Sequence, residues 1–482
     1  QTMRATIDWS YDLLSSPEQR VFERLSIFAG GCTLTSAQAV CAGEDVAAAE
    51  VFDLISALLD KSMAVAEFDG IEPRYRLLES FRQYAREKLV ARGEEQIVAH
   101  RHAVASLEFA EWLSREHESE SDEIRVARAR AEWDNWRATL EWALTNRGDV
   151  VLGQRLAGEL YIVWSCIAPV EGRRWMALAL SLVDEATPSS VIARLHEIDA
   201  SAAWLFADWS AQLTSSESAL KLYRELGDDL GVGRTQMLAA HALGGLGRNA
   251  EAEELLREAL PNVRRRGSRK TLANVLSGLA YARDSSGDYV AARTYFAESN
   301  AIFASLGASV SVANTTYALS DLEFSAGNAE LAIRLAIDAL ESFRALNNTR
   351  LASRTLSSIA AYLLSLRRYD EAEERAREAL DIAIEGQLLT CIGDALEKIA
   401  TVATLRMQGA GKHNLETYRL ATQLLGFAGA YCAEARQPYA QQECDRVLAV
   451  LRGALGADAV TNLMAEGSMM TQEQALATAA EI

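Results

Sequence analysis

A repeat of 40 residues runs through the middle of this chain and limits how the chain can fold. Four related turns follow one another at that interval, at Gly247, Gly287, Gly327 and Arg367. A second set of turns keeps the same period, at Gly227, Gly267, Gly307 and Asn347. Glycine and asparagine adopt the left-handed conformation that ends a helix more readily than other residues. The pattern therefore predicts repeats of two helices, stacked into an array.

Small residues keep the same period inside the predicted helices. One helical position carries Ala240, Ala280, Ser320 and Ala360, and another carries Ala252, Ala292, Ala332 and Ala372. A small side chain at a fixed position lets the two helices of a repeat approach closely. The chain also holds only 6 prolines in 482 residues, which suits long helices because proline removes an amide donor. The sequence therefore predicts a mostly α fold.

These repeats resemble tetratricopeptide repeats through the Gly287–Tyr289 turn and the recurring alanine that begins at Ala252. The usual repeat has about 34 residues, so a longer repeat implies longer helices. The resemblance implies an α-solenoid over residues 191–405. Its inner groove is expected to bind a protein or peptide partner, or a small inducer.

By the same resemblance, the groove residues lie on the first helix of each repeat, away from the small-residue face. The candidates are Arg234, His241, Asn274, Ser277, Tyr281, Asn314, Tyr317, Asp321 and Arg354. Their side chains are polar and mixed in charge. Two interpretations stay open, namely a solvated helix face and a surface that contacts a ligand.

Residues 1–93 show a different pattern. Helices are expected at 2–14, at 16–30 with Ser16 as the N-cap, at 35–42, at 46–59 and at 80–92. Two short strands are expected at 63–68 and 74–78, around a turn at Asp69 and Gly70. This order is that of a winged-helix domain. We expect a helical connector over 94–190 and a C-terminal helical cap over 406–482.

Several segments resemble the bacterial STAND ATPases, regulators of the AfsR and LuxR-like type. They are TIDWSYDLL at 6–14, LSIFAGG at 25–31, YRLLESFRQYA at 75–85, AEWDNWRA at 131–138, EGRRW at 171–175 and ATQLLGFA at 421–428. In that family an effector domain and an ATPase domain precede a winged helix and helical repeats. The resemblance implies that this chain is the regulatory sensor or protein-interaction arm. ATP and Mg²⁺ are expected only in an upstream ATPase domain, with no cofactor in this chain. Because the chain begins at Gln1 with sequence typical of the middle of a domain, we expect a part of a longer protein.

One departure from the family concerns nucleotide contact. Related proteins place a histidine between the wing strand and the next helix, where this chain has Leu78. The winged helix also raises the alternative of a DNA-binding regulator. Its recognition helix, however, carries Glu50, Asp53 and Asp60, whereas helices that enter the major groove present mainly basic and amide side chains. The net charge of −19 also repels phosphate backbones, so direct nucleic-acid binding is not expected.

Motifs for catalysis are missing from the sequence. The segment Gly409–Lys412 has some glycines of a P-loop but not its spacing or its Ser/Thr. None of the histidines forms a zinc-protease pair, and His100 and His102 are expected to face solvent. We therefore expect no enzyme activity and no metal site. A pure protein–protein scaffold remains a second alternative to a sensor.

The cysteines are Cys32, Cys41, Cys166, Cys391, Cys432 and Cys444. Their wide spacing gives no disulfide framework, so buried, reduced thiols are expected. Charged residues interrupt the most apolar stretch, near 160–170, and no membrane contact is expected. The sequence therefore indicates a cytoplasmic protein.

Overall fold

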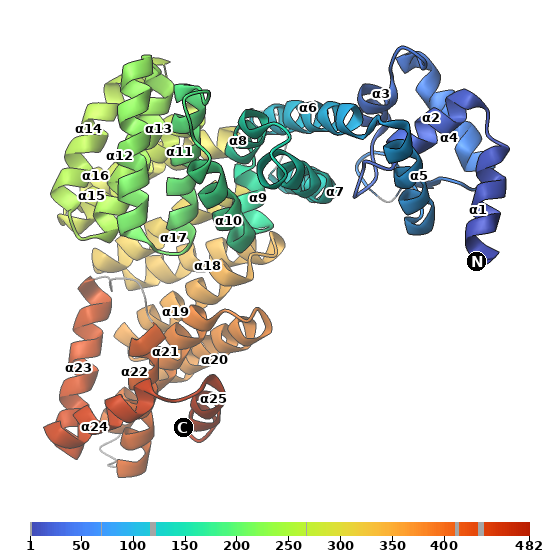
Figure 1. Ribbon diagram of the computed structural model, residues 1–482. Coiled ribbons are helices and arrows are strands. Elements are labelled where there is room, and N and C mark those ends of the chain that lie inside the picture. Colours follow the sequence, from blue (N-terminus) through green and yellow to red (C-terminus); the bar gives the residue numbers. More distant parts are fainter. Residues whose placement is uncertain (1, 69, 116–121, 267, 410–413, 432–437) are drawn as a thin grey trace. The chain divides into compact units, whose positions relative to one another are not determined.

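The computed structural model describes residues 2–68, 70–115, 122–266, 268–409, 414–431 and 438–482 (Figure 1). Contacts divide the chain into two compact units, residues 1–238 and 239–482. Both units are built almost wholly from α-helices. Four predicted features lie outside the described residues, namely the turn residues Asp69 and Gly267, the segment 410–413 and Cys432.

The first compact unit begins with short helices around an apolar core. They are α1 (Thr2–Asp12), α2 (Ser16–Leu25), α3 (Leu34–Cys41), the 3₁₀ turn η1 (Ala48–Glu50), α4 (Val51–Asp60) and α5 (Glu79–Arg92). Ser15, one residue before the predicted cap, begins α2 in a capping box with Glu18. Phe22 from α2 and Ile55 and Leu58 from α4 are fully buried in this core.

A two-stranded hairpin lies between α4 and α5. β1 (Val65–Glu67) and β2 (Arg74–Arg76) pair in antiparallel fashion, with Ala66 opposite Tyr75. Cys32 adds an isolated bridge to Tyr75. Both strands form where the sequence predicts them, and both are shorter. The assignment of this segment to the winged-helix class stays a prediction.

The helix α2 ends at Leu25, so the prediction that it continues to Gly30 is wrong. A side chain distant in sequence holds the following loop. The backbone amides of Ala29 and Gly30 donate to Asn135 Oδ1 at 3.0 and 3.2 Å, and Asn135 Nδ2 donates to the carbonyl of Gly31 at 2.9 Å. Such tertiary contacts override the local helix pattern.

A helical segment follows α5 and has its own core. Its elements are α6 (Glu95–Ser114), α7 (Asp122–Leu140), the π-helical turn η2 (Glu141–Thr145), α8 (Val150–Glu159), α9 (Tyr161–Cys166) and α10 (Pro169–Ser181). Trp136 and Trp164 are almost fully buried, with Leu156 between apolar neighbours.

Regular helix pairs make up the rest of the array. Their bounds are α11 (Ser189–Leu205), α12 (Trp209–Leu226), α13 (Asp229–Gly245), α14 (Asn249–Arg266), α15 (Arg269–Ser285), α16 (Tyr289–Ser305), α17 (Ser309–Ser325), α18 (Ala329–Ala345), α19 (Thr349–Ser365), α20 (Tyr369–Glu385), α21 (Leu389–Gly409) and α22 (Leu415–Tyr431). α11 packs on α12, and from α14 to α22 each helix packs on the next, as short turns require. Repeating helices therefore form the predicted solenoid.

The turns of the array adopt the predicted left-handed conformation at intervals of 20 residues. Positive φ angles occur at Ala207, Gly227, Gly247, Gly287, Gly307, Gly327, Asn347, Arg367 and Gln387. No heavy atom outside the local backbone lies within 4 Å of a Cβ built on Gly287. The glycine there serves backbone conformation and not close packing.

Three further helices end the chain, α23 (Pro438–Leu455), α24 (Ala457–Ser468) and α25 (Gln472–Ala480). In the described residues, no single helix is long and apolar enough to cross a membrane, although the bent pair Gln441–Leu455 and Ala457–Ser468 meets both criteria together. Of the described cysteines, Cys32, Cys41 and Cys391 are buried. The expectation of a buried thiol is wrong for Cys166, which is exposed.

Candidate functional site

The predicted groove residues lie on the first helices of successive repeats. α15 carries Asn274, Ser277 and Tyr281, α17 carries Asn314, Tyr317 and Asp321, and α19 carries Arg354. Tyr281 keeps 42% of its surface exposed, and the other six are half-buried. All belong to the compact unit of residues 239–482.

Five side chains from these three helices influence one another electrostatically. We call them the tyrosine–aspartate cluster: Tyr281, Asp284, Tyr317, Asp321 and Arg354. Burial raises the pKa of Tyr281 to about 12, while Asp321 and Asp284 add to the rise and Arg354 opposes it. Burial likewise raises the pKa of Tyr317, again with Asp321 adding and Arg354 opposing. The structure therefore brings four predicted residues together and adds Asp284.

Hydrogen bonds from α19 hold the α17 members of the cluster. Tyr317 Oη lies 2.9 Å from Ser358 Oγ. Tyr362 Oη donates to Asp321 Oδ1 at 2.5 Å and lies 3.2 Å from Ser320 Oγ. Because Tyr362 is fully buried, it fixes the position of the Asp321 carboxylate.

Asp284 lies in surroundings that disfavour its charge. Burial, followed by the nearby carboxylate of Asp321, raises the pKa of Asp284 to about 6. At neutral pH the cluster therefore holds carboxylates that repel one another, and a cationic group bound beside them would relieve this repulsion. The 40-residue pattern does not identify Asp284, which lies just under one helical turn after Tyr281, outside the predicted column.

Arg234 is committed to a buried ion pair in the compact unit of residues 1–238. Its Nε donates to Glu197 Oε1 at 2.7 Å and its Nη2 donates to Oε2 at 3.1 Å. Arg194 lies 3.1 Å from the same carboxylate, and Tyr223 donates to it at 2.6 Å. Burial alone would raise the pKa of Glu197, but Arg194 and Arg234 hold it at about 2.

Ser277 is directed toward its own repeat. Its Oγ lies 2.7 Å from Ser299 Oγ on α16, and Ser299 donates to the carbonyl of Ala273 at 2.7 Å. Three other candidates, His241, Asn274 and Asn314, are half-buried. Their predicted role in a groove stays a prediction.

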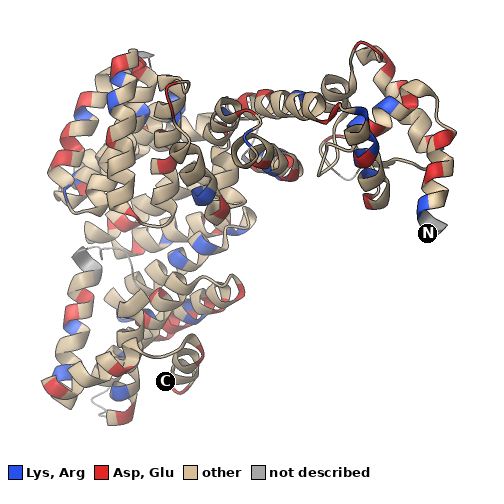
Figure 2. Cartoon of the chain, in the orientation of Figure 1, with Lys and Arg blue, Asp and Glu red and all other residues tan. Residues whose placement is uncertain are grey.

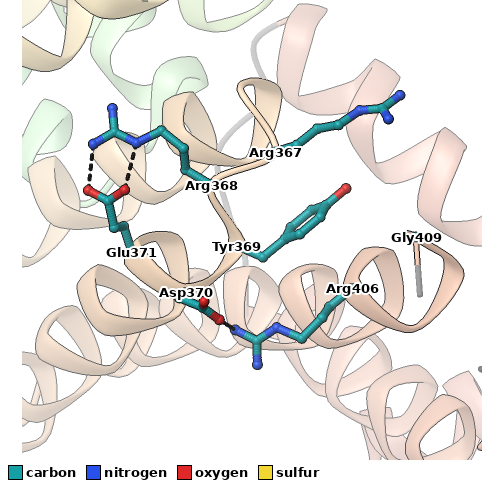
Figure 3. A pocket seen from close by; sticks show the side chains of 7 residues that line it. All are labelled: Arg367, Arg368, Tyr369, Asp370, Glu371, Arg406 and Gly409. Carbon is teal, nitrogen blue, oxygen red and sulfur yellow. Dashed lines mark hydrogen bonds and ion pairs between the residues drawn. The ribbon is translucent and has the colours of Figure 1, made fainter.

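A cavity of about 530 Å³ lies where the turn between α19 and α20 meets the end of α21 (Figure 3). Figure 3 shows Arg368 paired with Glu371 and Arg406 paired with Asp370, the latter at 2.9 Å. Arg367 also lines it. Because carboxylates of the same cavity neutralise two of its three arginines, it offers little net attraction to an anion.

A second cavity of about 200 Å³ lies among α5, α6 and α7. His102 lines this cavity and is only 4% exposed, so the expectation that it faces solvent is wrong. His100 is exposed, with 55% of its side chain accessible. The helix α6 is covered by α3, α7 and α8, and this coverage cannot be deduced from the spacing of two histidines.

Charge is spread over the helices of both units, with acidic and basic residues interspersed (Figure 2). On α4, the predicted recognition helix, the exposed side chains include Phe52, Asp53 and Asp60. The sequence of α4 contains no lysine or arginine. This helix therefore lacks the cations that hold DNA phosphates.

Comparison with known proteins supports the helical repeats. Residues 311–385 match the family described as "Tetratricopeptide repeat". A Mycobacterium bovis protein named "Putative HTH-type transcriptional regulator Mb0914c" is 40% identical over 176 residues, which cover 36% of this chain and 20% of that protein. An uncharacterized Mycobacterium tuberculosis protein is 45% identical over 103 residues, 21% of this chain and 26% of that protein. The chain thus spans only a fifth to a quarter of the length of these relatives.

Two solved structures share the fold. A STAND protein with a tetratricopeptide repeat sensor from Pyrococcus horikoshii aligns with a TM-score of 0.52 at 17% identity, over 92% of this chain and 66% of that one. A Rap protein complexed with Competence and Sporulation Factor aligns with a TM-score of 0.50 at 13% identity, over 76% of this chain and 99% of that one. Residues 311–385 thus belong to tetratricopeptide repeats, and part of the chain is homologous to mycobacterial proteins whose names describe them as putative transcriptional regulators.

Proposed function

We propose that this chain is the sensor arm of a STAND-type signalling regulator. Its repeats receive a peptide, or a segment of a partner protein, on the face that carries the tyrosine–aspartate cluster. The cluster is the observation that carries the proposal, because three consecutive first helices contribute to it.

The pKa shifts in the cluster favour a ligand surface over a solvated helix face. A carboxylate on a freely solvated face keeps its ordinary pKa, whereas burial raises the pKa of Asp284 to about 6. Tyr281 is partly accessible, yet burial is the main cause of its raised pKa. Partial burial and shifted pKa values are commoner among binding residues than on a freely solvated helix face.

The chemistry of the cluster favours a peptide that carries at least one cationic side chain. The rings of Tyr281 and Tyr317 offer large, rigid contact area, which interfaces use often. Asp284 and Asp321 offer acceptors for a lysine or arginine. Arg354 gives a counter-charge for a carboxylate of the same peptide. The cluster therefore selects peptides by the positions of their cationic and anionic side chains, and not only by their net charge.

The comparisons support a regulatory role. Relatives that are 40% identical over 176 residues carry the name "Putative HTH-type transcriptional regulator". One protein with this fold is a STAND protein whose repeats are described as a sensor, and another is complexed with Competence and Sporulation Factor. A repeat surface that binds an effector is therefore consistent with the fold.

Within this proposal, residues 1–93 form a winged helix, 94–190 a connector, 191–405 the repeats and 406–482 a cap. ATP and Mg²⁺ bind an ATPase domain of the full regulator. A ligand shifts that regulator between its off and on states only by its difference in affinity for the two. The sensor arm performs no chemistry itself.

Two alternatives to the sensor, a scaffold and a DNA-binding regulator, require different properties of the chain. A pure scaffold binds a partner through the same cluster without changing ATP turnover. A DNA-binding regulator needs a basic helix, and α4 instead carries Asp53 and Asp60. The acidic character of α4 favours the sensor over the DNA-binding alternative.

The test uses random-sequence peptides displayed on phage, selected on the full chain. Calorimetry then gives the affinity of each selected peptide for the unaltered chain and for the variants Tyr281→Ala and Asp321→Asn. Each variant is expected to weaken binding by about tenfold or more, as central contact residues do. The matched control is Glu254→Gln on α14, an exposed carboxylate on the second helix of a repeat.

Peptides that bind the unaltered chain and both cluster variants equally well would contradict the proposal. A regulator that joins this chain to its ATPase domain separates sensor from scaffold. Selected peptides change its ATP turnover if the chain is a sensor, and leave the turnover unchanged if the chain is a scaffold.

A further inference from the structure

The helix α23 lies beside the last repeats and does not continue their stack (Figure 1). The stack continues with α24, which packs broadly on α22. A Cβ built on Gly426 would collide with the backbone of Met464. One built on Gly467 would collide with the backbone of Gln423, so α22 and α24 approach closely. The helix α23 instead packs on both α21 and α22, as an additional helix at the end of the array.

The predicted column of groove residues continues onto α21. The position of Tyr317 on α17 recurs, in steps of 40 residues, as Ser357 on α19 and as Glu397 on α21. Tyr317 is half-buried, whereas Ser357 and Glu397 are buried. Every residue of α21 over 395–405 is buried, which amounts to about three turns and every face of the helix. The groove side of α21 is therefore covered, unlike that of α17.

An ion pair joins α23 to the covered side of α21. Lys398 Nζ lies 3.5 Å from Glu443 Oε2 on α23 and 3.4 Å from Glu397 Oε1 on its own helix. Lys398 occupies the position that Ser358 has on α19, where Ser358 Oγ lies 2.9 Å from the hydroxyl of the groove residue Tyr317. This position faces the groove, so Glu443 reaches Lys398 from the groove side.

Charges connect this contact with the tyrosine–aspartate cluster. Burial raises the pKa of the Cys391 thiol on α21, while Asp394 adds to the rise and Arg354 of the cluster opposes it. Burial also opposes the charge of Lys398, but carboxylates that include Asp394 hold its pKa above the ordinary value. Asp394 therefore acts on both contacts. The cluster and the contact of α23 form one row of charges along α17, α19 and α21.

The docked position of α23 carries an electrostatic cost. Burial raises the pKa of Glu443, with Lys398 opposing the rise and Glu397 adding to it. The Oε2 atom of Glu443 makes no hydrogen bond in the described residues. Two carboxylates thus share one ammonium group, and an ionised Glu443 disfavours the docked position. A helix held in this way is open to replacement by a ligand.

We propose that α23 is an internal competitor of the ligand: it occupies the end of the groove at α21, and a peptide bound at the tyrosine–aspartate cluster displaces it. This inference rests on the proposed function, because the ligand is the peptide that the cluster receives. Neighbouring helices lie roughly 10 Å apart, which puts α17 and α21 roughly 20 Å apart. An extended peptide covers about 3.3 Å per residue, so roughly six residues bridge that distance. Competition therefore requires a peptide that extends by this length from the cluster toward α21.

The test uses the peptides selected on the full chain and a series shortened residue by residue from either end. Calorimetry measures their affinities for the unaltered chain and for two variants of α23. Leu451→Ala removes a fully buried contact and loosens α23, so peptides that reach α21 should bind about fivefold more tightly or better. Glu443→Gln removes the charge that disfavours docking, so the same peptides should bind about threefold more weakly. Peptides too short to reach α21 should respond to neither substitution.

Matched controls separate competition from general destabilisation. Leu463→Ala makes the same change at a buried residue of α24 and should leave all affinities unchanged. Asp445→Asn is the control for Glu443→Gln, because Asp445 is exposed on the same helix. Circular dichroism checks that each variant is folded. Hydrogen–deuterium exchange of the unaltered chain gives a readout without any variant, since a long peptide should speed the exchange of amides in α23.

A helix with a merely structural role would give a different result. In that case Leu451→Ala would leave the affinity of long peptides unchanged or lower it, and exchange in α23 would stay the same when a long peptide protects α15 and α17. That outcome would overturn this inference and leave the proposed function standing. Selection that yields no peptide, or peptides indifferent to Tyr281→Ala and Asp321→Asn, would contradict the proposed function and this inference together.

Discussion

The phenol of Tyr362 on α19 donates a hydrogen bond of 2.5 Å to the carboxylate of Asp321 on α17. Tyr362 is fully buried, and its ring also packs on Phe324 with a centroid distance of 4.5 Å. A buried residue in one repeat thus fixes a candidate ligand contact in the preceding repeat. Binding at Asp321 is therefore coupled to the packing of α17 against α19.

Replacement of Tyr362 by phenylalanine should destabilise this part of the array. The variant loses a hydrogen bond to a charged group, which is worth about 2 kcal/mol when buried. Native-state hydrogen exchange of amides in α17 and α19 measures the change. Tyr289→Phe, a half-buried tyrosine outside the cluster, serves as the control and should change exchange little. Equal effects of the two substitutions would show that the Tyr362–Asp321 bond contributes nothing.

Asp284→Asn should stabilise the chain at neutral pH. The folded chain holds the Asp284 proton with a pKa of about 6, whereas the reference value is 3.8. Folding is therefore penalised as pH rises through this range, because the folded carboxylate ionises less readily. Asparagine does not ionise, so the free energy of unfolding of the variant should exceed that of the unaltered chain by about 1–2 kcal/mol at pH 7. Its advantage should vanish near pH 4, and an advantage that does not change with pH would contradict the assigned cause.

Glu197→Gln should destabilise the compact unit of residues 1–238. It removes the carboxylate that pairs with Arg234 and leaves Arg194 with only the half-buried Glu159 at 3.6 Å, at a cost of about 3 kcal/mol at pH 7. The folded pKa of about 2 lies below the reference value of 4.5, so the stabilisation is complete above that value and is lost toward pH 2. The difference between variant and unaltered chain should therefore shrink as pH falls from about 4.5.

Tryptophan fluorescence during urea unfolding suits this measurement, because all nine tryptophans precede residue 210. Arg173→Gln is a matched control, since Arg173 forms an exposed pair with Asp208 and should matter little. A stability difference for Glu197→Gln that is the same at pH 7 and pH 3 would contradict the ion-pair account.

The left-handed turns lead us to expect opposite effects on stability from substitutions at two of them. Gly287 has φ of 80°, and alanine there should cost about 1 kcal/mol although no atom obstructs its Cβ. Gln387 has φ of 53°, and glycine there should stabilise by about 0.5–1 kcal/mol. Gly244→Ala in the last turn of α13 is the control, since Gly244 has no positive φ and alanine favours the helical conformation. Urea unfolding followed by circular dichroism gives the order of stabilities, and stabilisation by Gly287→Ala would refute the role of these turns.

The sequence predicts the array well because its signals are local and repeated. A glycine or asparagine that ends a helix acts within a few residues, and the period fixes where the next one lies. Left-handed residues without this chemistry, such as Ala207 and Gln387, are recognised only from the period itself. Small residues such as Ala280 and Ala292 are fully buried, as close packing of the two helices requires.

The N-terminal segment is predicted less well because distant side chains decide its details. The helix α2 stops at Leu25 since Asn135, more than one hundred residues later, holds the loop that follows. His102 is buried because α7 and other helices cover α6, whereas two histidines close in sequence only suggested a polar face. Neither effect has a local signal.

The candidate site is predicted less well than the repeat array and better than the N-terminal segment. The 40-residue column identifies Tyr281, Tyr317, Asp321 and Arg354, which the structure brings together. The same column includes Arg234, whose guanidinium instead pairs with Glu197. Periodicity predicts which face a residue occupies but not which partner it finds, because the partner depends on the neighbouring repeat.

Hydrogen–deuterium exchange of the full chain, with and without a selected peptide, tests the central claim most directly. If the first helices of the repeats form the ligand surface, the peptide should protect amides in α15, α17 and α19, where the tyrosine–aspartate cluster lies. Protection confined to the second helices α16, α18 and α20, or to residues 1–238, would contradict it.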